Sequence, residues 1–176
     1  QNGSDIRGVA LEGIEGESVN LTNEVTTALA QAFVAWLGEK NGKTAQTIAV
    51  GSDSRISSPA LCKAFADGAA AAGATVLNFG MASTPAMFMA TVDEQLRADG
   101  AVMVTASHLP WNRNGLKFFT AKGGLEKADI ARILELAPQF MGAEKKGNGE
   151  VKVVDFMATY CDILANYIRR GVNNGD

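Results

Sequence analysis

The sequence predicts an α/β fold: a three-layer α/β/α domain with a mostly parallel, mixed central sheet. Short apolar strands and amphipathic helices alternate along the chain, and polar turns separate them. Alternation of this kind joins parallel strands through helical crossovers and covers both faces of an open sheet. With 176 residues, 47% of them hydrophobic, the chain is long enough for one domain with its own core.

The first half of the chain supplies a helix and then a strand and helix unit. Apolar residues at helical spacing predict a helix from Thr22, its N-cap, to Glu39, with Gly42 beyond its end. The segment Thr47–Val50 is short and β-rich, and Ser58 before Pro59 is typical of a helix start. The predicted elements of this half are therefore helix 22–39, strand 47–50 and helix 59–72.

The second half repeats the unit and adds a returning strand. Thr84-Pro85 opens a helix that carries Met87, Phe88 and Val92. The strand at 116–120 follows the strand at 101–105 after a short loop, so we expect it to run antiparallel and make the sheet mixed. The remaining predicted elements are strand 75–79, helix 126–137, an exposed loop at 142–150, strand 151–154 and a helix from Phe156 to Arg170 that stops at Gly171.

Composition argues against several classes of protein. The 16 basic and 19 acidic residues nearly balance, and the longest run of like charge is Lys145-Lys146, so we expect neither nucleic acid nor membrane as a partner. No apolar stretch reaches the about 20 residues that span a bilayer. Cys62 and Cys161 lie far apart without C-x-x-C spacing, which favours a reducing, cytoplasmic setting. The first residue is Gln1 rather than Met, so the chain is expected to be cut from a longer protein, and an organellar targeting peptide before it stays open.

Three loops after predicted strands hold polar residues with no evident packing purpose, and ligands of such sheets bind at these loops. They span residues 52–57, 82–84 and 106–115. The third is the richest, since it contains Ser107, His108 and Arg113 and is followed by Lys117. Its composition suits a phosphate group.

The serine and histidine of the third loop are compatible with several roles. On composition alone, a turn or capping serine and a structural histidine are the commoner ones. A serine hydrolase needs a base that reaches the nucleophile, and we expect His108, the immediate neighbour of Ser107, to be poorly placed for this; no G-x-S-x-G occurs either. Neither G-x-G-x-x-G nor a Walker A sequence is present. Of the chemistries considered, phosphoryl transfer to and from a serine remains.

Four ordered segments then resemble one family. Thr105-Ala106-Ser107-His108-Leu109-Pro110, followed by Asn114-Gly115-Leu116-Lys117, is similar to the T-A-S-H-N-P and N-G-x-K of the phosphoserine loop of the α-D-phosphohexomutases. The segments at 4–8, 51–58 and 80–85 are similar to the family's D-x-I-R-G, G-R-D-x-R-x-S-S/G and G-x-x-x-T-P. The chain departs from these patterns at Leu109, where most members have Asn, and at Ser52, where many have Arg.

The resemblance implies that residues 1–176 form domain I, the phosphoserine-loop domain, of a phosphoglucomutase or phosphomannomutase whose later domains are absent from this chain. The implied enzyme is an isomerase, an intramolecular phosphotransferase that interconverts hexose 1-phosphate and hexose 6-phosphate. The reaction proceeds through a phosphoserine and a hexose 1,6-bisphosphate, which is also the activator. Its partners would be the hexose phosphate, of unspecified sugar, and the other domains of the same protein.

The resemblance also implies roles for single residues. Ser107 carries the phosphate and, through it, one ligand of Mg²⁺, whose other ligands lie in a later domain. Arg7 and Arg55 supply positive charge and bind substrate phosphate, with a surface or interdomain ion pair as the alternative. Lys117 and His108 manage the proton of the attacking hydroxyl, so the catalytic set is Ser107, His108, Lys117 and Arg7. The isolated chain is expected to be inactive. The alternative is a non-catalytic, phosphohexomutase-like phosphoprotein or regulatory binding module, which the Leu109 departure keeps open.

Overall fold

Seven strands form one mixed sheet with the order β1-β5-β4-β2-β3-β7, and β6 pairs with β5 at the side. The computed structural model describes residues 5–142 and 147–174. Strands β2, β3, β4 and β7 run parallel, whereas β5 is antiparallel to both β4 and β1. The strands are β1 (Asp5–Val9), β2 (Thr47–Ser52), β3 (Thr75–Met81), β4 (Gly100–Val104), β5 (Arg113–Thr120), β6 (Gly123–Gly124) and β7 (Glu150–Val153).

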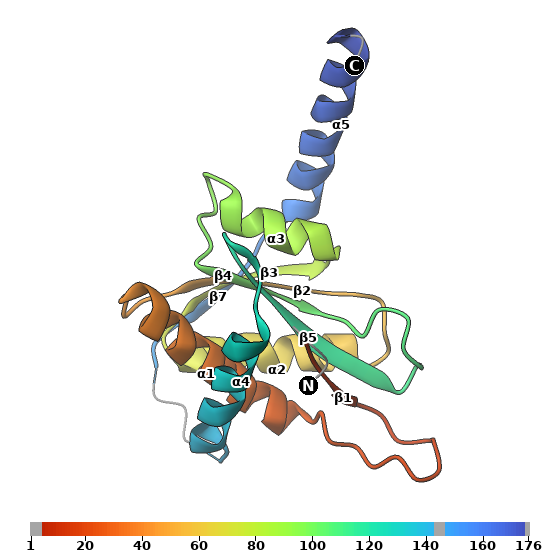
Figure 1. Cartoon of the computed structure of the whole chain (residues 1–176), viewed down its shortest axis with the longest axis vertical. Helices are drawn as coiled ribbons and strands as arrows, with labels where there is room; N and C mark the ends of the chain where they lie inside the picture. The colour runs from red at the N-terminus through yellow and green to blue at the C-terminus, as the bar shows by residue number, and fades with distance from the viewer. Residues whose placement is uncertain (1–4, 143–146, 175–176) are drawn as a thin grey trace.

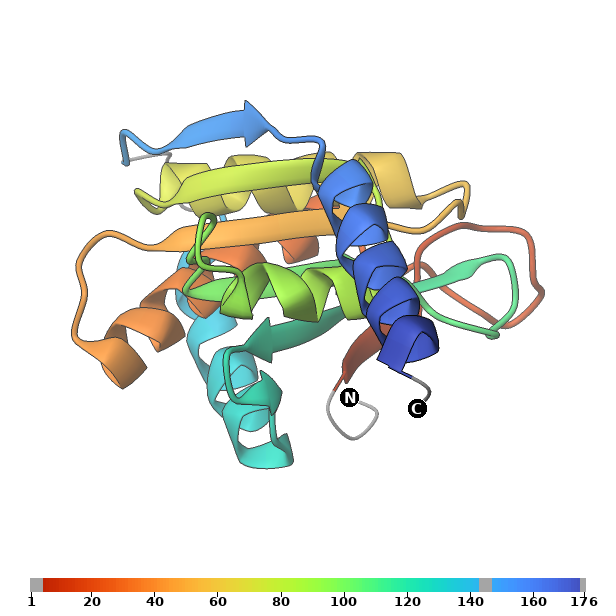
Figure 2. The same cartoon turned by 90° about the horizontal axis from the view of Figure 1, so that it is seen from above.

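Helices cover both faces of the sheet, as Figures 1 and 2 show. Helices α1, α2 and α4 lie on one face, and α3 with the start of α5 lies on the other. The helices are α1 (Asn23–Asn41), α2 (Ser58–Ala71), α3 (Thr84–Val92), α4 (Lys127–Leu136) and α5 (Phe156–Asn174), with a 3-10 turn η1 at Ala137–Phe140. The predicted three-layer α/β/α class is confirmed.

Two hydrophobic cores, one on each face, follow from the alternation of side chains along the strands. Val102 of β4 and Phe118 of β5 face α1 and α2, where the ring of Phe118 lies 4.9 Å from that of Phe33. Met103 and Phe119, one residue along each strand, face α3 instead. Strand β5 is therefore buried on both faces and fixes the position of the loop that precedes it.

The local signals for helix ends act in part as predicted. The predicted N-cap Ser58 is instead the first residue of α2, and Ser57 before it is the N-cap, without a hydrogen bond from its side chain to the described helix. Thr22 is the N-cap of α1 and accepts a hydrogen bond from the Val25 N–H at 3.2 Å. Gly42 ends α1 with φ of +70°. By contrast, the predicted stop at Gly171 is wrong, because α5 continues to Asn174; a single glycine weakens a helix by about 1 kcal/mol without having to end it.

Two features of the sheet were not predicted. No strand was predicted at β1, where the sequence showed only the D-x-I-R-G motif. Strand β5 begins at Arg113, three residues before the predicted start at Leu116. The two are linked, since β1 pairs with the added residues of β5, with Gly8 opposite Asn114 and Arg7 opposite Gly115. Asn114 and Gly115 therefore belong to a strand and not to the loop.

Helix α5 projects away from the rest of the molecule (Figure 1). Phe156 packs against Phe79, but the apolar side chains of Leu164, Tyr167 and Ile168 further along are 43%, 67% and 67% exposed. None of the described helices is both long and apolar enough to cross a membrane. Ser4 of the first motif, the pair Lys145-Lys146 and the residues Gly175 and Asp176 lie outside the described part of the chain.

Candidate active site

The candidate site lies where β2 and β4 end side by side, with Ser52 opposite Val104. The chain then enters two loops, 53–57 after β2 and 105–112 after β4. After β2 the chain goes on to β3 on one side, whereas after β4 it returns to β5 on the other side. The ends of β2 and β4 are therefore the kind of position at which open α/β sheets bind ligands. The predicted loop at 82–84 follows β3, where the Ala82 N–H donates to the Ser52 carbonyl at 2.9 Å and Ser83 caps α3 by accepting from the Ala86 N–H at 3.3 Å.

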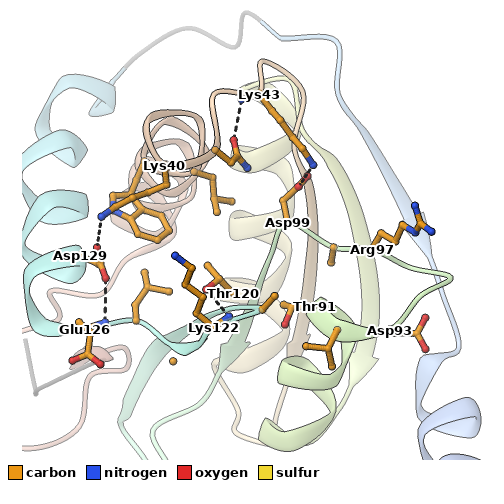
Figure 3. A pocket seen from close by; sticks show the side chains of 18 of the residues that line it. Lys40, Lys43, Thr91, Asp93, Arg97, Asp99, Thr120, Lys122, Glu126 and Asp129 are labelled. Carbon is orange, nitrogen blue, oxygen red and sulfur yellow. Dashed lines mark hydrogen bonds and ion pairs between the residues drawn. The ribbon is translucent and has the colours of Figure 1, made fainter.

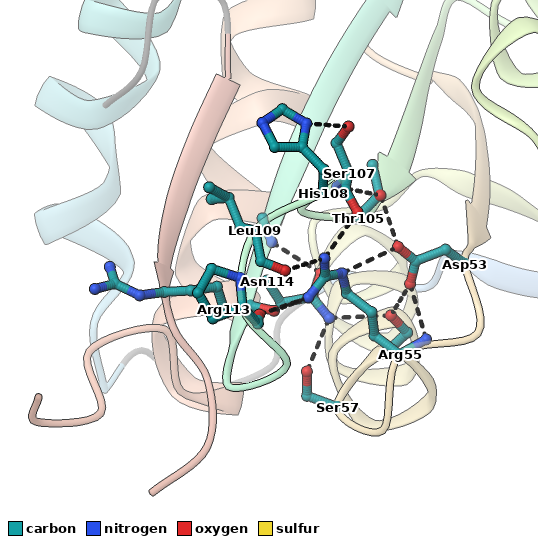
Figure 4. Close-up of polar contacts among 12 residues, drawn as sticks. Asp53, Arg55, Ser57, Thr105, Ser107, His108, Leu109, Arg113 and Asn114 are labelled. Carbon is teal, nitrogen blue, oxygen red and sulfur yellow. Dashed lines mark hydrogen bonds and ion pairs between the residues drawn. The ribbon is translucent and has the colours of Figure 1, made fainter. Parts of the chain in front are cut away.

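Ser107 is exposed near the start of the second loop and has an unusual backbone. Its φ is +56°, a left-handed conformation that residues with a side chain rarely adopt. Its N–H donates to Thr105 Oγ1 at 3.0 Å. Its Oγ lies 3.2 Å from Nδ1 of His108 (Figure 4), so the expectation that His108 is poorly placed to reach this hydroxyl is wrong. The left-handed backbone at Ser107 accompanies this contact between neighbouring residues.

A hydrolase triad still lacks its third member. Among the described residues, no carboxylate hydrogen-bonds to the other ring nitrogen of His108. A triad uses such a group to fix the histidine tautomer and to stabilise the imidazolium. The Ser107 hydroxyl therefore has one neighbouring group, the His108 imidazole, that can accept or donate a proton.

Asp53 connects the two loops. Its Oδ1 accepts from the Ser58 hydroxyl at 2.6 Å and from the Arg55 N–H at 3.0 Å. Its Oδ2 accepts from Thr105 Oγ1 at 2.6 Å. The same Thr105 oxygen accepts from the Ser107 N–H, so the carboxylate acts on Ser107 through one intervening hydroxyl. Asp53 and Thr105 both lie in the family motifs, but neither was predicted to be a site residue.

Arg55 directs its guanidinium at the backbone of the Ser107 loop (Figure 4). Its side chain is only 13% exposed, and Nε lies 3.4 Å from Asp53 Oδ2. The terminal nitrogens donate to four carbonyl oxygens at 2.7–3.0 Å, namely those of Ser107, Leu109, Pro110 and Arg113. The phosphate-binding role predicted for Arg55 stays a prediction, since its hydrogen bonds in this structure hold the loop.

A second brace reaches the loop from the segment after β1. Glu17 accepts hydrogen bonds from Asn112 Nδ2 at 2.8 Å and from the Arg113 guanidinium. The N–H groups of Ala10 and Leu11 donate to the Asn112 carbonyl at 2.8 and 3.1 Å. The hydrogen bond from Asn112, and then the one from Arg113, lower the pKa of the Glu17 carboxyl. No sequence signal pointed to Glu17, which lies 95 residues before Asn112.

Asn114, the second residue of β5, connects this strand to the end of the first loop by hydrogen bonds. It is fully buried, and its Nδ2 donates to the hydroxyls of Ser57 and Ser58 at 2.8 and 3.0 Å. Its Oδ1 accepts from the Gly115 N–H at 2.8 Å. Ser57 is thus held as part of the framework, at the beginning of α2.

Arg7 and Lys117 come from the neighbouring strands β1 and β5. Arg7 Nη2 lies 2.8 Å from Asp5 Oδ2, and Lys117 Nζ lies 3.9 Å from Asp5 Oδ1. Gly115 is opposite Arg7 and accepts from the Thr105 N–H at 3.0 Å. Arg7 therefore lies at the level where the chain enters the Ser107 loop, and Lys117 lies two residues further along β5. The ion pair of Arg7 with Asp5 lies within β1, and its side chains are only 19% and 9% exposed, so it is not the surface or interdomain pair given as the alternative. The phosphate-binding role of Arg7 stays a prediction.

Of the cavities among the described residues, one lies away from this cluster and another borders it at Asp53 and Arg55. One of about 830 Å³ lies at the opposite end of the sheet, where its rim carries the ion pairs of Lys40 with Asp129 and of Lys43 with Asp99 (Figure 3). Asp99 precedes β4, so this cavity is remote from the loops at the other end of that strand. The other is a groove beside Asp53 that includes Cys62, whose pKa burial raises to about 11. That thiol is protonated at neutral pH and is a poor nucleophile.

The described residues supply little to a metal ion. No group of three or more His, Cys, Asp or Glu side chains among them is placed to hold one. Mg²⁺ prefers oxygen ligands and usually binds through one or two carboxylates together with substrate phosphates. The exposed Ser107 hydroxyl, once phosphorylated, fits as the position from which one such oxygen would come.

Comparison with known proteins shows the family of this chain. The family described as phosphoglucomutase/phosphomannomutase, alpha/beta/alpha domain I, matches residues 1–139. A phosphomannomutase of Vibrio cholerae is 34% identical over 152 residues, which cover 84% of this chain and 32% of that protein. A phosphoglucomutase/phosphomannomutase of Thermococcus kodakarensis is 32% identical, with coverages of 93% and 34%. A phosphoglucosamine mutase of Synechococcus elongatus is 38% identical, with coverages of 72% and 27%.

Solved structures give the same result. A phosphoglucomutase/phosphomannomutase family protein from Burkholderia thailandensis superposes with a TM-score of 0.71 and 26% identity, covering 90% of this chain and 33% of that one. A Thermus thermophilus structure gives a TM-score of 0.73 and covers 93% of this chain and 34% of that one. The chain thus spans about a third of the length of these relatives. Because the matched family model covers the Ser107 loop and both of its braces, the chain belongs to the phosphoglucomutase/phosphomannomutase family as its α/β/α domain I.

Proposed function

We propose that this chain is the phosphoserine-bearing part of a longer phosphohexomutase, which interconverts hexose 1-phosphate and hexose 6-phosphate. The observation that carries the proposal is Ser107 itself. Its hydroxyl is exposed, a histidine nitrogen lies 3.2 Å away, and its loop is fixed by side chains from two other segments. An exposed hydroxyl on a rigid loop is what a covalent phosphate carrier requires.

The reaction would proceed in two phosphoryl transfers. In the first, a hydroxyl of the hexose monophosphate attacks the phosphorus on Ser107. The bond from phosphorus to the serine oxygen breaks as the bond to the sugar oxygen forms, and the sugar hydroxyl loses its proton. The hexose 1,6-bisphosphate then reorients, and its other phosphate returns to Ser107. A free bisphosphate would act as activator by phosphorylating an empty Ser107.

The nearby side chains have distinct proposed tasks. His108 lies next to the serine oxygen and can hold the proton that this oxygen needs when it leaves phosphorus. Lys117 would take up or return the proton of the sugar hydroxyl. Arg7 and Arg55 would supply positive charge near the transferred phosphoryl group, Arg55 from its position against the Ser107 loop. Positive charge placed in this way is the main means by which proteins stabilise phosphoryl transfer.

Mg²⁺, when bound to the phosphate on Ser107, would neutralise part of its negative charge. Its remaining ligands would come from a later domain, together with the groups that select the sugar. Relatives named as a phosphomannomutase, a phosphoglucomutase and a phosphoglucosamine mutase support a hexose phosphate as the proposed substrate class. We also propose a cytoplasmic location, which the two widely separated cysteines favour.

The proposal is tested by Ser107→Ala in the full-length protein. Turnover of hexose 1-phosphate should be abolished, and mass spectrometry should find the phosphate on Ser107 of the unmodified protein. Ser54→Ala is a matched control, since Ser54 is an exposed serine of the neighbouring loop with no hydrogen bond from its side chain. Phosphate on Ser57 or Ser83 with a dispensable Ser107 would contradict the proposal. Phosphate on Ser107 without turnover would favour the non-catalytic phosphoprotein.

A further inference from the structure

We propose that Arg55 is a positioning residue that sets the backbone of Ser107 through the shape of its guanidinium, with Asp53 and Thr105 completing the arrangement. The functional meaning of this role rests on the proposed phosphate transfer at Ser107. The structural role can be tested without it.

Three hydrogen bonds and one ion pair form a closed ring around Ser107. Starting at Asp53, the ring runs through Thr105 Oγ1 to the Ser107 N–H, with donor to acceptor distances of 2.6 and 3.0 Å. It leaves by the Ser107 carbonyl, which accepts from Arg55 Nη2 at 2.8 Å. It closes where Arg55 Nε lies 3.4 Å from Asp53 Oδ2. Both polar groups of the Ser107 backbone are thus held by side chains.

Such a ring explains why Ser107 keeps a φ of +56°. A left-handed conformation at a residue with a side chain persists only where the surroundings fix it from more than one direction. The Thr105 hydroxyl fixes the amide side, and Arg55 fixes the carbonyl side. This conformation in turn decides where the Ser107 hydroxyl points.

The shape of Arg55 matters more than its charge. Its two terminal nitrogens bond four carbonyls that come from residues 107, 109, 110 and 113. Guanidinium offers five N–H donors in a planar fork, whereas a lysine ammonium has three donors around one point. Lysine would keep the positive charge but lose the simultaneous contacts. If the charge of Arg55 were what holds the loop, lysine would be better tolerated than an uncharged side chain.

Two substitutions separate these two roles in the unphosphorylated chain. Amide hydrogen exchange measured by NMR is compared for the unmodified chain, Arg55→Lys and Arg55→Met. The reporters are the N–H groups of Ser107, Leu109 and Arg113, which bond Thr105 Oγ1 and the carbonyls of Ala106 and Pro110. We expect exchange at these amides to rise by about tenfold or more in both variants, with no rescue by lysine, while amides of β4 change less than about twofold.

The control and the second variant keep the test decisive. Arg132→Met removes a guanidinium that bonds Glu39 and Glu135 on the surface, and it should leave the loop amides unchanged. If the Arg55 variants fail to fold, Thr105→Val decides, because it breaks the ring on the amide side while leaving Arg55 in place. It should raise exchange at Ser107 by about tenfold and have less effect at Arg113.

Three results would overturn the inference. Loop protection in Arg55→Lys equal to that of the unmodified chain would show that charge is enough. Equal acceleration of the loop and of β4 would show that Arg55 stabilises the whole fold rather than the loop. Unchanged exchange at the Ser107 amide in Thr105→Val would show that the ring does not hold this amide. Since no measurement involves phosphate, failure of the proposed mutase function would leave these outcomes unaffected.

Discussion

Replacing Gly115 by alanine tests how tightly the strands beneath the site are packed. A Cβ at this position would lie 2.6 Å from the Ile6 carbonyl oxygen, 2.9 Å from Arg7 Cγ and 3.0 Å from the Thr105 carbonyl oxygen. Two of these neighbours are backbone atoms of β1 and of the chain leaving β4, so they cannot move away alone. The residue between Asn114 and Leu116 is a glycine because three segments of the site meet there.

The size of the effect follows from two opposing terms. Overpacking of this kind typically costs about 1–3 kcal/mol. Losing the conformational freedom of glycine in the unfolded chain returns about 0.4–1 kcal/mol. The extremes of these two ranges leave a net loss between about 0 and 2.6 kcal/mol. Because the Ile6 oxygen at 2.6 Å is a backbone atom, we expect the upper part of this range, above about 1 kcal/mol, which for a domain of this size lowers Tm by at least about 2 °C.

Thermal unfolding followed by circular dichroism measures the change in Tm, and Gly171→Ala is the matched control. A Cβ at Gly171 meets no atom within 4 Å, and alanine favours a helix by about 1 kcal/mol over glycine, so Tm should hold or rise. NMR shifts at Arg7 and Thr105 should change in Gly115→Ala alone. A Tm for Gly115→Ala within about 1 °C of the unmodified chain would refute the packing argument.

The remaining predictions concern charge, metal and catalysis. The folded pKa of Glu17 is lowered by Asn112 and Arg113, so its contribution to stability is present above the unfolded pKa of about 4.3 and is lost as pH falls through the folded pKa. Glu17→Gln should therefore lower Tm near neutral pH, with a difference that shrinks below about pH 4; a difference independent of pH would count against the brace. The isolated chain should show no mutase activity with Mg²⁺ and a hexose bisphosphate, and a rate like that of a full-length mutase would contradict the division of the site between domains. Calorimetry should find no tight, stoichiometric Mg²⁺ site in the unphosphorylated chain. In the full-length protein Lys117→Met should lower kcat by about 10²–10⁴-fold while Ser107 stays phosphorylated, and a near-normal kcat would remove Lys117 from the mechanism.

Periodicity predicted the central strands and their helices because each of these strands is a continuous apolar run and each helix has an apolar face. It could not predict β1, whose five residues include Gly8 and which is a strand because β5 pairs with it. The same pairing moved the start of β5 to Arg113 and turned part of the expected loop into strand. Pairing of this kind depends on a partner more than 100 residues away, which local propensity does not contain.

The site shows the same division between local and distant information. Motif resemblance predicted that the segments containing Ser107, Arg55 and Arg7 belong to one site, and the structure places the first two in direct contact. The resemblance alone predicted that Arg55 binds substrate phosphate, because an arginine in a motif of a phosphoryl-transfer enzyme suggests that its positive charge faces the phosphate. Its bonds to four carbonyls become visible only when the loop is folded over it.

This difference changes what the G-x-D-x-R pattern means in physical terms. Two residues apart on the loop after β2, Asp53 and Arg55 turn toward the end of the neighbouring strand and bond a hydroxyl and carbonyls there. Neither contact involves a ligand, yet both end at Ser107, whose N–H and carbonyl they hold in a conformation that the residue would otherwise avoid. A carrier serine must present its oxygen in one direction to two successive transfers, and an error of about 1 Å in such positioning can cost about 100-fold in rate. In the proposed mechanism the motif therefore supports Ser107, and we expect lysine to be a poor substitute at Arg55 even though its charge is the same.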